Sequence, residues 1–285
     1  MDTVHRIDAL RAQVNAWRRS GERVALVPTM GNLHHGHIRL VDHAHTLAER
    51  IVASVFVNPL QFGPSEDYGR YPRTLEDDGS KLRHAGLDLL FAPELSEVYP
   101  RGIENATRVE VPGLSQILCG AFRPGHFEGV ATVVTKLFNM VQPDVAVFGE
   151  KDWQQLVVIR SLVADLNLPI EIAGVPTVRE ADGLAMSSRN NYLTPDERRT
   201  APVLFATIST AVERLRAGDK DFAAIETGAA ATLEGAGFRP DYVEVRRSYD
   251  LARPGDCDHE LLVVAAAWLG RARLIDNCRV ALPAS

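Results

Sequence analysis

Residues 23–57 read RVALVPTMGNLHHGHIRLVDHAHTLAERIVASVFV, and the order of apolar runs in this stretch decides the fold. The run Arg23–Val27 predicts a buried strand, and the loop Pro28–Gly36 follows it. Helical spacing of apolar residues then covers His37–Arg50, and the β-branched run Ile51–Val57 predicts a second strand. Two strands joined by a helix form a crossover unit, so we expect them to be parallel neighbours.

The alternation of helix and strand continues along the chain. A helix precedes the first strand, with apolar residues at helical spacing from Ile7 to Trp17 and Gly21 in the position of a C-terminal cap. Further helices are predicted near 74–84, 130–141 and 153–166, and further strands over 87–91, 145–148 and 170–175. Strands separated by helical crossovers of this length predict an α/β fold, a doubly wound parallel sheet with helices on both faces.

The pattern changes after Asn191. Thr194, Pro195 and Glu197 mark the start of a helix that we expect to be continuous, with its apolar face formed by Leu204, Ile208, Ala211 and Leu215. A second helix is predicted over 222–233, and strands over 242–246, 261–269 and 273–277. Turn-rich connections between these strands favour a small antiparallel sheet. We therefore expect a sheet domain, 1–178, and a smaller C-terminal α+β domain, 179–285.

Composition and charge exclude several classes of protein. At about 150 residues per domain, a chain of 285 residues predicts two domains, and a hydrophobic content of 46% is that of an ordinary folded protein. The 31 basic and 37 acidic residues give a net charge of −6, which argues against a nucleic-acid partner. Three scattered cysteines fit no disulfide framework, and neither a signal peptide nor a membrane-spanning run is visible. We expect a cytoplasmic protein with no membrane partner.

Histidines gather in the loop after the first strand. Of the nine in the chain, His34, His35 and His37 lie beside the predicted start of a helix. In doubly wound sheets ligands bind at the carboxyl ends of strands, and a helix N-terminus attracts phosphate. Residues three apart on a helix share a face, so His34 and His37 can point toward one ligand, while Gly36 allows its close approach. Solvated histidines or a zinc site are the alternatives, although the chain has no HExxH pattern.

Three other segments carry polar groups suited to a small anionic ligand. FVNPLQF at 56–62 ends the second strand and offers Asn58 and Gln61 among apolar residues. FGEKDWQQL at 148–156 lies at another strand-to-helix turn, where a lysine can neutralise phosphate charge. MSSR at 186–189 combines two hydroxyls with a guanidinium, whose fork suits phosphate oxygens. Each segment alone could be an ordinary turn, cap or polar hinge.

Together the segments carry a resemblance. HHGH at 34–37 is similar to the HxGH signature of the nucleotidyltransferase superfamily, whose members attack the α-phosphate of ATP and release pyrophosphate. With PTMGNLHHGH, FVNPLQF, FGEKDWQQL and GLAMSSRN in this order, and RPGHF at 123–127, the chain resembles the pantoate–β-alanine ligase family, most closely over 22–194. The resemblance implies a Rossmann-like domain and an enzyme that joins (R)-pantoate to β-alanine through a pantoyl adenylate. It also implies Mg²⁺ bound through the phosphates of ATP, no metal held by the protein itself, and a homodimer formed through the N-terminal domain.

The resemblance assigns roles to individual residues. His37 would donate a proton during adenylation, and the other catalytic residues would be His34, Lys151, Ser187 and Arg189. Contacts with ATP are implied for Met30, Gly31, Asn32, Leu33, His34, His35, Gly36, His37, Gly149, Glu150, Lys151, Asp152, Val178, Met186, Ser187, Ser188 and Arg189. Contacts with pantoate or β-alanine are implied for Pro28, Met30, Gln61 and Gln155, with Arg123 and His126 as neighbours of the site.

Two other functions remain open from the sequence. Another HxGH nucleotidyltransferase, one that transfers AMP to a phosphate-bearing acceptor, shares the histidine loop but does not require the segments at 56–62 and 148–156. A nucleotide-sensing module without catalysis is disfavoured because both histidines and both phosphate-gripping segments are present. The C-terminal domain, beside the loop at 187–189, is expected to act as a lid that closes over ATP and excludes water.

Overall fold

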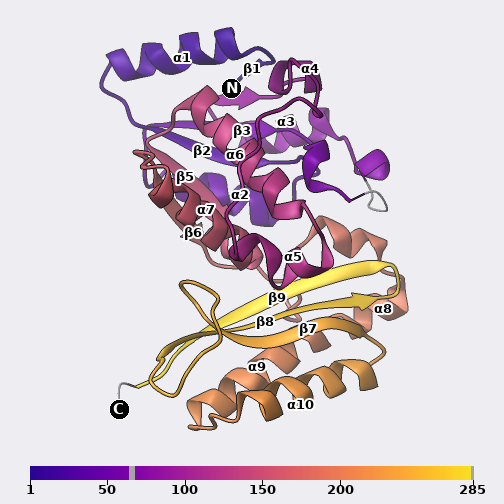
Figure 1. Ribbon diagram of the computed structural model, residues 1–285. Helices are drawn as coiled ribbons and strands as arrows, with labels where there is room; N and C mark the ends of the chain where they lie inside the picture. The colour runs from indigo at the N-terminus through magenta and orange to yellow at the C-terminus, as the bar shows by residue number, and fades with distance from the viewer. Residues whose placement is uncertain (64–67, 284–285) are drawn as a thin grey trace. The chain divides into compact units, whose positions relative to one another are not determined.

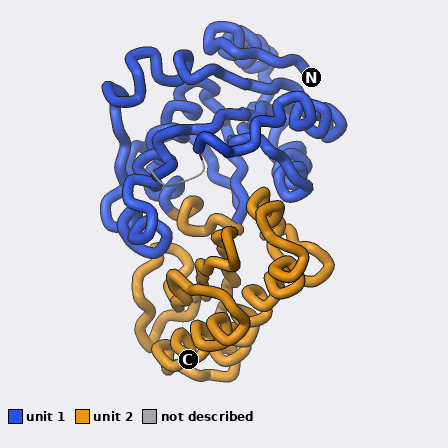
Figure 2. The backbone as a smooth tube through the Cα atoms, turned by 90° about the vertical axis from the view of Figure 1, so that its right-hand side faces the viewer, with its two compact units in different colours: residues 1–150, 158–176 blue, residues 151–157, 177–285 orange. Residues whose placement is uncertain are grey.

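The computed structural model describes residues 1–63 and 68–283. They form two compact units, which we call unit 1 and unit 2 (Figure 2). Unit 1 consists of 1–150 with 158–176, and unit 2 consists of 151–157 with 177–285. The short segment 151–157 therefore belongs with the C-terminal part of the chain, although the residues that follow it return to unit 1.

Unit 1 is built on a six-stranded sheet with the strand order β1-β4-β3-β2-β5-β6. The strands are β1 (Asp2–Val4), β2 (Val24–Thr29), β3 (Arg50–Val55), β4 (Leu89–Phe91), β5 (Val145–Gly149) and β6 (Glu171–Val175). Each described pair is parallel, so the predicted parallel sheet is confirmed. β1 was not predicted, because three residues with the sequence DTV are too short and too polar to show a strand pattern.

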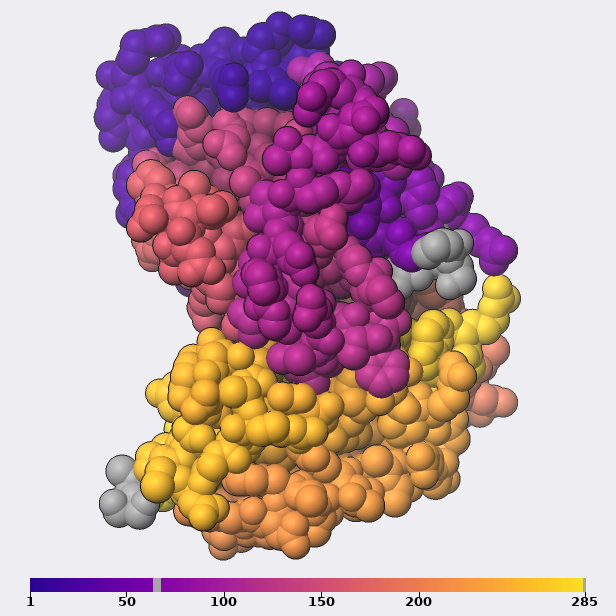
Figure 3. All heavy atoms as spheres, viewed as in Figure 1, coloured from indigo at the N-terminus to yellow at the C-terminus, as the bar shows by residue number. Residues whose placement is uncertain are grey.

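Helices cover both faces of this sheet (Figure 1). The α-helices are α1 (Ile7–Arg19), α2 (His35–Ala44), α3 (Leu75–His84), α4 (Leu95–Val98), α5 (Cys119–Phe122), α6 (His126–Val141) and α7 (Trp153–Asp165), and the first residues of α7 lie in unit 2. The 3-10 helices are η1 (Pro59–Gln61), η2 (Tyr68–Arg70), η3 (Leu114–Gln116) and η4 (Glu150–Asp152). The connection from β4 to α6, which holds α4, η3 and α5, lies on the surface shown in Figure 3, where it is magenta.

The two faces of the sheet bury different side chains, because neighbouring residues of a strand point to opposite faces. Val27 on β2 and Val147 on β5 are fully buried in a cluster that also contains Val41 of α2. The next residue of β5, Phe148, instead meets the ring of Phe138 on α6, with the ring centroids 6.4 Å apart. Helices α2 and α6 therefore cover opposite faces.

The strand order reverses between β2 and β5. From β2 the sheet continues to β3 and β4 on one side and to β5 and β6 on the other. β2 and β5 pair through Ala25↔Val145 and Leu26↔Ala146, short of their carboxyl ends. In open α/β sheets such a reversal forms a crevice outside the carboxyl ends of the strands, where ligands bind. The histidine loop starts at this point.

Strand β2 is longer than the sequence predicts. It runs to Thr29 instead of ending at Val27, because Pro28 and Thr29 still lie opposite Ser54 and Val55 of β3. Pro28 has no backbone N–H to donate to a neighbouring strand. It is tolerated here because the pairing of β2 with β5 ends at Leu26, before the proline.

Helix α2 starts earlier and ends sooner than the sequence predicts. It begins at His35, because the side chain of His34 caps its N-terminus, and it ends at Ala44 instead of Arg50. The backbone N–H of Thr46 then donates to the carbonyl three residues back at 2.9 Å, which tightens the chain into a turn. Residues 45–49 therefore connect α2 to β3 rather than extending the helix.

Unit 2 contains a three-stranded antiparallel sheet, which confirms the predicted small sheet. Its strands are β7 (Arg239–Arg247), β8 (Glu260–Leu269) and β9 (Ala272–Ala281), and its helices are η5 (Ser188–Tyr192), α8 (Pro195–Thr200), α9 (Val203–Arg216) and α10 (Phe222–Gly235). The prediction of one continuous helix after Thr194 is wrong. Thr194 and Glu197 form a capping box for α8, but Pro202 has no N–H for the helical hydrogen bond, so the chain restarts as α9.

Candidate active site

The histidine loop enters α2 through an N-cap made by His34. Its Nδ1 atom accepts a hydrogen bond from the backbone N–H of Gly36 at 3.1 Å. The Nδ1 atom of His37 accepts one from the backbone N–H of His34 at 3.2 Å. The centroids of the two imidazole rings are 4.1 Å apart. The two histidines that the sequence analysis expects to face one ligand therefore lie against each other at the helix N-terminus.

These hydrogen bonds fix the neutral tautomer of both rings. A ring nitrogen that accepts from a backbone N–H carries no hydrogen itself, so in neutral His34 and His37 the hydrogen is on Nε2. Nε2 is then a hydrogen-bond donor. Donors beside the partial positive charge of a helix N-terminus suit the oxygen atoms of a phosphate.

A buried carboxylate holds the loop that leads to these histidines. Asp78 on α3 is fully buried, and its carboxylate accepts hydrogen bonds from the backbone N–H groups of Asn32 at 2.9 Å and Leu33 at 2.7 Å. The Thr74 hydroxyl donates to the same carboxylate at 3.1 Å, and Lys81 Nζ donates to the Leu33 carbonyl at 2.8 Å. Asn32 has a left-handed φ of 52°, which the hydrogen bond to Asp78 stabilises. Asp78 was not predicted from the sequence.

A second polar network fixes the side chain of Gln61 in η1. Asn58 Nδ2 donates to the carbonyl of Gly129 at 3.0 Å and to Gln61 Oε1 at 3.2 Å, and the Tyr99 hydroxyl donates to Asn58 Oδ1 at 2.8 Å. Because a carbonyl only accepts, Gly129 determines which end of the Asn58 amide carries the donors, and Asn58 in turn orients Gln61. Burial raises the pKa of Tyr99 far above its ordinary value, so its hydroxyl stays protonated and able to donate.

Other predicted neighbours contact Gln61 as well. Its Nε2 atom lies 3.0 Å from Sδ of Met30. Its backbone carbonyl accepts hydrogen bonds from His126 Nδ1 at 2.8 Å and from Arg123 Nη2 at 3.4 Å, and Arg123 Nη1 lies 3.0 Å from His126 Nε2. Met30 after β2, Gln61 in η1, Arg123 at the end of α5 and His126 at the start of α6 therefore form one group within unit 1.

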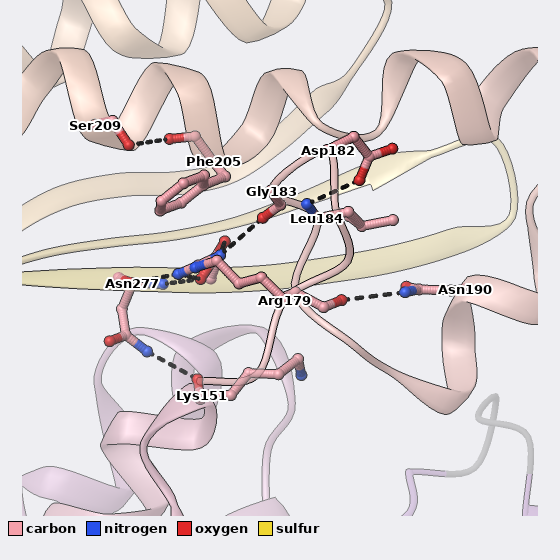
Figure 4. A network of polar contacts seen from close by, with 11 residues as sticks. Lys151, Arg179, Asp182, Gly183, Leu184, Asn190, Phe205, Ser209 and Asn277 are labelled. Atoms are coloured by element: carbon pink, nitrogen blue, oxygen red, sulfur yellow. Dashed lines mark hydrogen bonds and ion pairs between the residues drawn. The ribbon is translucent and has the colours of Figure 1, made fainter. Parts of the chain in front are cut away.

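Lys151 belongs to unit 2 and lies in η4, two residues before α7 begins at Trp153 (Figure 4). Its backbone carbonyl accepts a hydrogen bond from Asn277 Nδ2 at 2.8 Å, and its Nζ atom lies 3.8 Å from Oδ2 of Asp152. Two residues further on, the indole N–H of Trp153 donates to the carbonyl of Ser248 at 2.7 Å. The start of α7 is thus hydrogen-bonded to strands of the C-terminal sheet and their ends.

The Met186–Arg189 segment follows a short hairpin of unit 2. The backbone N–H of Met186 donates to the carbonyl of Val178 at 2.9 Å, and the adjoining residues form an antiparallel bridge. Ser187 then caps η5, because its Oγ atom accepts a hydrogen bond from the backbone N–H of Arg189 at 3.2 Å. The loop that the resemblance links to phosphates is therefore ordered on both sides, by the hairpin before it and the cap after it.

The sequence-predicted contact residues fall into two sets. Unit 1 holds Pro28, Met30–His37, Gln61, Arg123, His126, Gly149 and Glu150, and unit 2 holds Lys151, Asp152, Gln155, Val178 and Met186–Arg189. Imidazole and amide groups dominate the first set, and ammonium, hydroxyl and guanidinium groups dominate the second. Both sets therefore carry hydrogen-bond donors of the kind that anionic substrates require.

Neither a metal-binding group of side chains nor a membrane-spanning helix occurs within residues 1–63 and 68–283. Within these ranges, no group of three or more His, Cys, Asp or Glu side chains could hold a metal ion. In the same part of the chain, no helix is both long enough and apolar enough to cross a membrane. The three clustered histidines therefore do not form a zinc site among the described residues.

Comparisons with known proteins point to one family along nearly the whole chain. A family model described as pantoate-beta-alanine ligase matches residues 2–279. The pantothenate synthetase of Thioalkalivibrio sulfidiphilus is 59% identical over 285 residues, which are 100% of each chain. The pantothenate synthetase of Shewanella amazonensis is 60% identical over 277 residues, which are 97% of this chain and 98% of its own.

Solved structures agree with this relationship. A pantothenate synthetase from Thermus thermophilus matches with a TM-score of 0.91 and 49% identity, covering 98% of this chain and 99% of its own. The pantoate-beta-alanine ligase of Francisella tularensis, solved as a complex with beta-gamma ATP and beta-alanine, matches with a TM-score of 0.81 and 32% identity. That match covers 98% of this chain and 97% of the other.

Proposed function

The chain belongs to the pantoate–β-alanine ligase family, and from this premise we propose that it joins (R)-pantoate to β-alanine with ATP, forming pantothenate, AMP and pyrophosphate. It is a ligase of that family, and the relatives match it over its full length. This full-length match favours the ligase over an enzyme that transfers AMP to a phosphate-bearing acceptor. The same match disfavours a sensor that only binds nucleotide.

The proposed reaction has two steps. A carboxylate oxygen of pantoate attacks the α-phosphorus of ATP, the bond to the β-phosphate breaks, and pantoyl adenylate and pyrophosphate form. The amine of β-alanine then attacks the acyl carbon, the bond from that carbon to AMP breaks, and the nitrogen loses a proton. Both steps concentrate negative charge on phosphate oxygens, so catalysis depends on positioning and electrostatic stabilisation.

The histidine loop acts on the first step in this proposal. His34 and His37 contact the triphosphate through their Nε2–H groups. His37 acts in adenylation by donating the hydrogen bond of Nε2–H to the phosphate oxygens on which charge develops as the bond to the β-phosphate breaks, while the hydrogen stays on the ring. The observation that carries this assignment is the pair of hydrogen bonds from backbone N–H groups to the Nδ1 atoms, because they make Nε2 the donor in both rings. The partial positive charge at the start of α2 adds to the stabilisation.

The phosphates are held by cationic and hydroxyl groups of the second set, Lys151, Ser187, Ser188 and Arg189. Arginine and lysine pair with phosphate oxygens, and the two serine hydroxyls add hydrogen bonds. Mg²⁺ would enter with ATP, bound to its phosphate oxygens, and would neutralise part of their charge. This assignment fits the donor set, since imidazole, ammonium and guanidinium groups are not the oxygen ligands that Mg²⁺ prefers.

The remaining contacts follow the same division. Gln61 and Gln155 bind pantoate through their amides, Gln61 also lies near β-alanine, and Pro28 and Met30 pack on the methyl groups of pantoate. The nucleotide is lined by Met30, Gly31, Asn32, Leu33, His35, Gly36, Gly149, Glu150, Asp152, Val178 and Met186, together with the phosphate-binding residues named above. In support, Gln61 has an amide orientation fixed by Asn58, which presents its Nε2 donors in one defined direction.

Three further features belong to the proposal. The chain functions as a cytoplasmic homodimer formed through its N-terminal domain. Light scattering in solution should give twice the subunit mass, and the mass of a single subunit would contradict the dimer.

Residues 1–178 form the domain that binds ATP and pantoate. Residues 179–285 act as a lid that excludes water from the adenylate. Small-angle scattering should then show compaction when ATP and pantoate are added together, and an unchanged profile would contradict the lid.

The decisive experiment is exchange of labelled pyrophosphate into ATP. The ligase should catalyse this exchange only when pantoate is present, because the adenylate must form before it can be reversed. Exchange that is independent of pantoate, or that needs a phosphate-bearing acceptor, would support the other nucleotidyltransferase. Binding of ATP with no exchange under any condition would support a sensor.

A further inference from the structure

Two consecutive residues of β9, Asp276 and Asn277, bind two different segments that lead into the proposed ATP site. Figure 4 shows Asn277 with Lys151 and Arg179. Asp276 and Asn277 are both buried, with exposed fractions of 2% and 6%. Neighbouring residues of a strand point to opposite faces of the sheet, so the two side chains reach in opposite directions. Neither residue lies in a segment that carries the family resemblance.

Asp276 anchors the hairpin that precedes the phosphate loop. Its two carboxylate oxygens accept hydrogen bonds from Arg179 Nη1 at 2.6 Å and Nη2 at 2.9 Å, a bidentate ion pair. Arg179 Nη1 also donates to the carbonyl of Gly183 at 3.1 Å, across the turn of the hairpin. The carboxylate therefore holds both sides of the hairpin through one guanidinium.

An aromatic ring closes the other side of this guanidinium. Arg179 Cζ lies 3.6 Å from the ring centroid of Phe205 on α9, within the range of a cation–π contact. Gly183 has a left-handed φ of 92°, and a Cβ atom there would lie 2.9 Å from Phe205 Cδ1, so no larger residue fits without a shift. Arg179 is thus fixed in one orientation between Asp276 and Phe205, and the hairpin that ends at Met186 is fixed with it.

Asn277 anchors the other segment. Its Nδ2 atom donates to the backbone carbonyl of Lys151 at 2.8 Å, in η4 just before helix α7. Arg279, two residues further along the same face of β9, lies over the ring of Trp153 with its Cζ 5.0 Å from the centroid. Asn277 also accepts a hydrogen bond at its backbone carbonyl from Arg179 Nη2 at 3.4 Å, which links the two anchors.

We propose that Asp276 and Asn277 are positioning residues for ATP, which set the spacing between Lys151 and the Ser187–Arg189 loop. This inference rests on the proposed function, because it takes those residues as phosphate contacts. Both segments are tied to adjacent residues of one strand, so the strand fixes the separation of groups that lie far apart in the sequence. Loss of either anchor would move phosphate ligands without removing any of them.

The test uses the full-length protein with Asn277→Asp, which keeps the shape of the side chain but replaces its donor with an acceptor facing the Lys151 carbonyl. Arg179→Lys is a second variant, which keeps the charge but loses the bidentate fork. Loss of a buried hydrogen bond should raise the KM for ATP roughly ten-fold in each variant. The KM for β-alanine should stay within about two-fold of the wild-type value, because no β-alanine contact lies in the two segments.

Val280→Ala provides the matched control, since Val280 is a buried apolar core residue on the same strand and its side chain has no group that could hydrogen-bond to either segment. It should lower the melting temperature while leaving the KM for ATP unchanged. An unchanged KM for ATP in both Asn277→Asp and Arg179→Lys would overturn the inference, and so would an equal rise in the KM values for ATP and β-alanine. If the wild type shows no pantoate-dependent exchange, the proposed function fails instead, and direct titration with ATP still decides whether the two anchors set its affinity.

Discussion

The carboxylate of Asp78 lies 2.7 Å from the backbone nitrogen of Leu33, which it joins across 45 residues of sequence. The same carboxylate accepts the backbone N–H of Asn32, so one buried side chain fixes two successive peptide groups just before the paired histidines. An acidic side chain thereby performs a structural role in a site whose proposed substrates are anions. The buried carboxylate is stabilised by the hydrogen-bond donors around it, the two backbone N–H groups and the Thr74 hydroxyl.

Asp78→Asn should weaken both the fold and the reaction. The amide would turn one acceptor oxygen into a donor facing a backbone N–H, which should cost about 1–3 kcal/mol in the free energy of unfolding. We expect pantoate-dependent exchange to fall roughly ten-fold, because the loop would no longer hold the histidines in place. Glu76→Gln is the control, since that carboxylate lies on the same helix but is exposed and outside the contacts that hold the loop. Equal activity of the two variants would contradict the role of Asp78.

His37→Ala should reduce turnover by a factor on the order of 10² to 10³, the usual effect of removing a donor that stabilises charge in the transition state. Folding should survive, because the side chain is only partly buried. Single-turnover formation of the adenylate is the direct measurement. His43→Ala, on the same helix but outside the proposed contacts, should leave the rate unchanged. A His37→Ala variant with near-normal turnover would refute the assigned role.

Tyr99→Phe should act on pantoate rather than on ATP. Removal of the hydroxyl leaves Asn58 Oδ1 without this donor in a buried site. The Gly129 carbonyl still orients the Asn58 amide, but Asn58 then holds the amide of Gln61 less firmly. The KM for pantoate should rise about five- to ten-fold, while the KM for ATP stays near the wild-type value. Val98→Ala, a fully buried neighbour without a side-chain hydrogen bond, gives a variant of lowered stability for comparison. A similar rise in the KM for pantoate in that control would assign the effect to stability alone.

Gly129→Ala should destabilise unit 1 by displacing η1. A Cβ atom at this position on α6 would lie 2.3 Å from the carbonyl oxygen of Leu60 and 2.6 Å from the backbone nitrogen of Gln61, and backbone atoms cannot move aside cheaply. We expect a loss of about 1–3 kcal/mol in urea denaturation. Gly228→Ala on α10 should have the opposite sign, a gain of about 0.5–1 kcal/mol, because its nearest contact is at 3.6 Å and alanine favours a helix.

Much of the fold could be predicted because each central strand carries its own signal. β5 reads VAVFG with four successive buried residues, and the helices between strands have clear apolar faces, so the parallel sheet followed from crossover rules. Errors occurred where a local feature competes with the periodicity. His34 caps α2 earlier than expected, and Pro202 splits one expected helix into two. β1 has only three residues, and its pairing with β4 depends on a segment far along the chain.

The residues with reactive side chains could be proposed from the sequence, but the residues that hold them could not. His34, His37 and Gln61 stand in recognisable segments at strand ends. Asp78 and Asn277, by contrast, bind backbone groups 45 and 126 residues away. Every residue has a backbone carbonyl, and every residue except proline a backbone N–H, so the sequence does not indicate which of them a side chain binds. Their acidic or amide character is equally typical of a helix surface or a strand edge. Such supports become visible only when the chain is folded.

Helix α7 imposes a condition on any attempt to express the two units separately. Its first residues belong to unit 2, where the indole of Trp153 donates to the carbonyl of Ser248, and its later residues belong to unit 1. A fragment that ends at 176 would carry Trp153 without this acceptor, and a fragment that begins at 177 would leave Asn277 without the carbonyl of Lys151. A single cut in the chain therefore yields two incomplete halves, and dissection of this protein calls for circular permutation or co-expression of fragments rather than simple truncation.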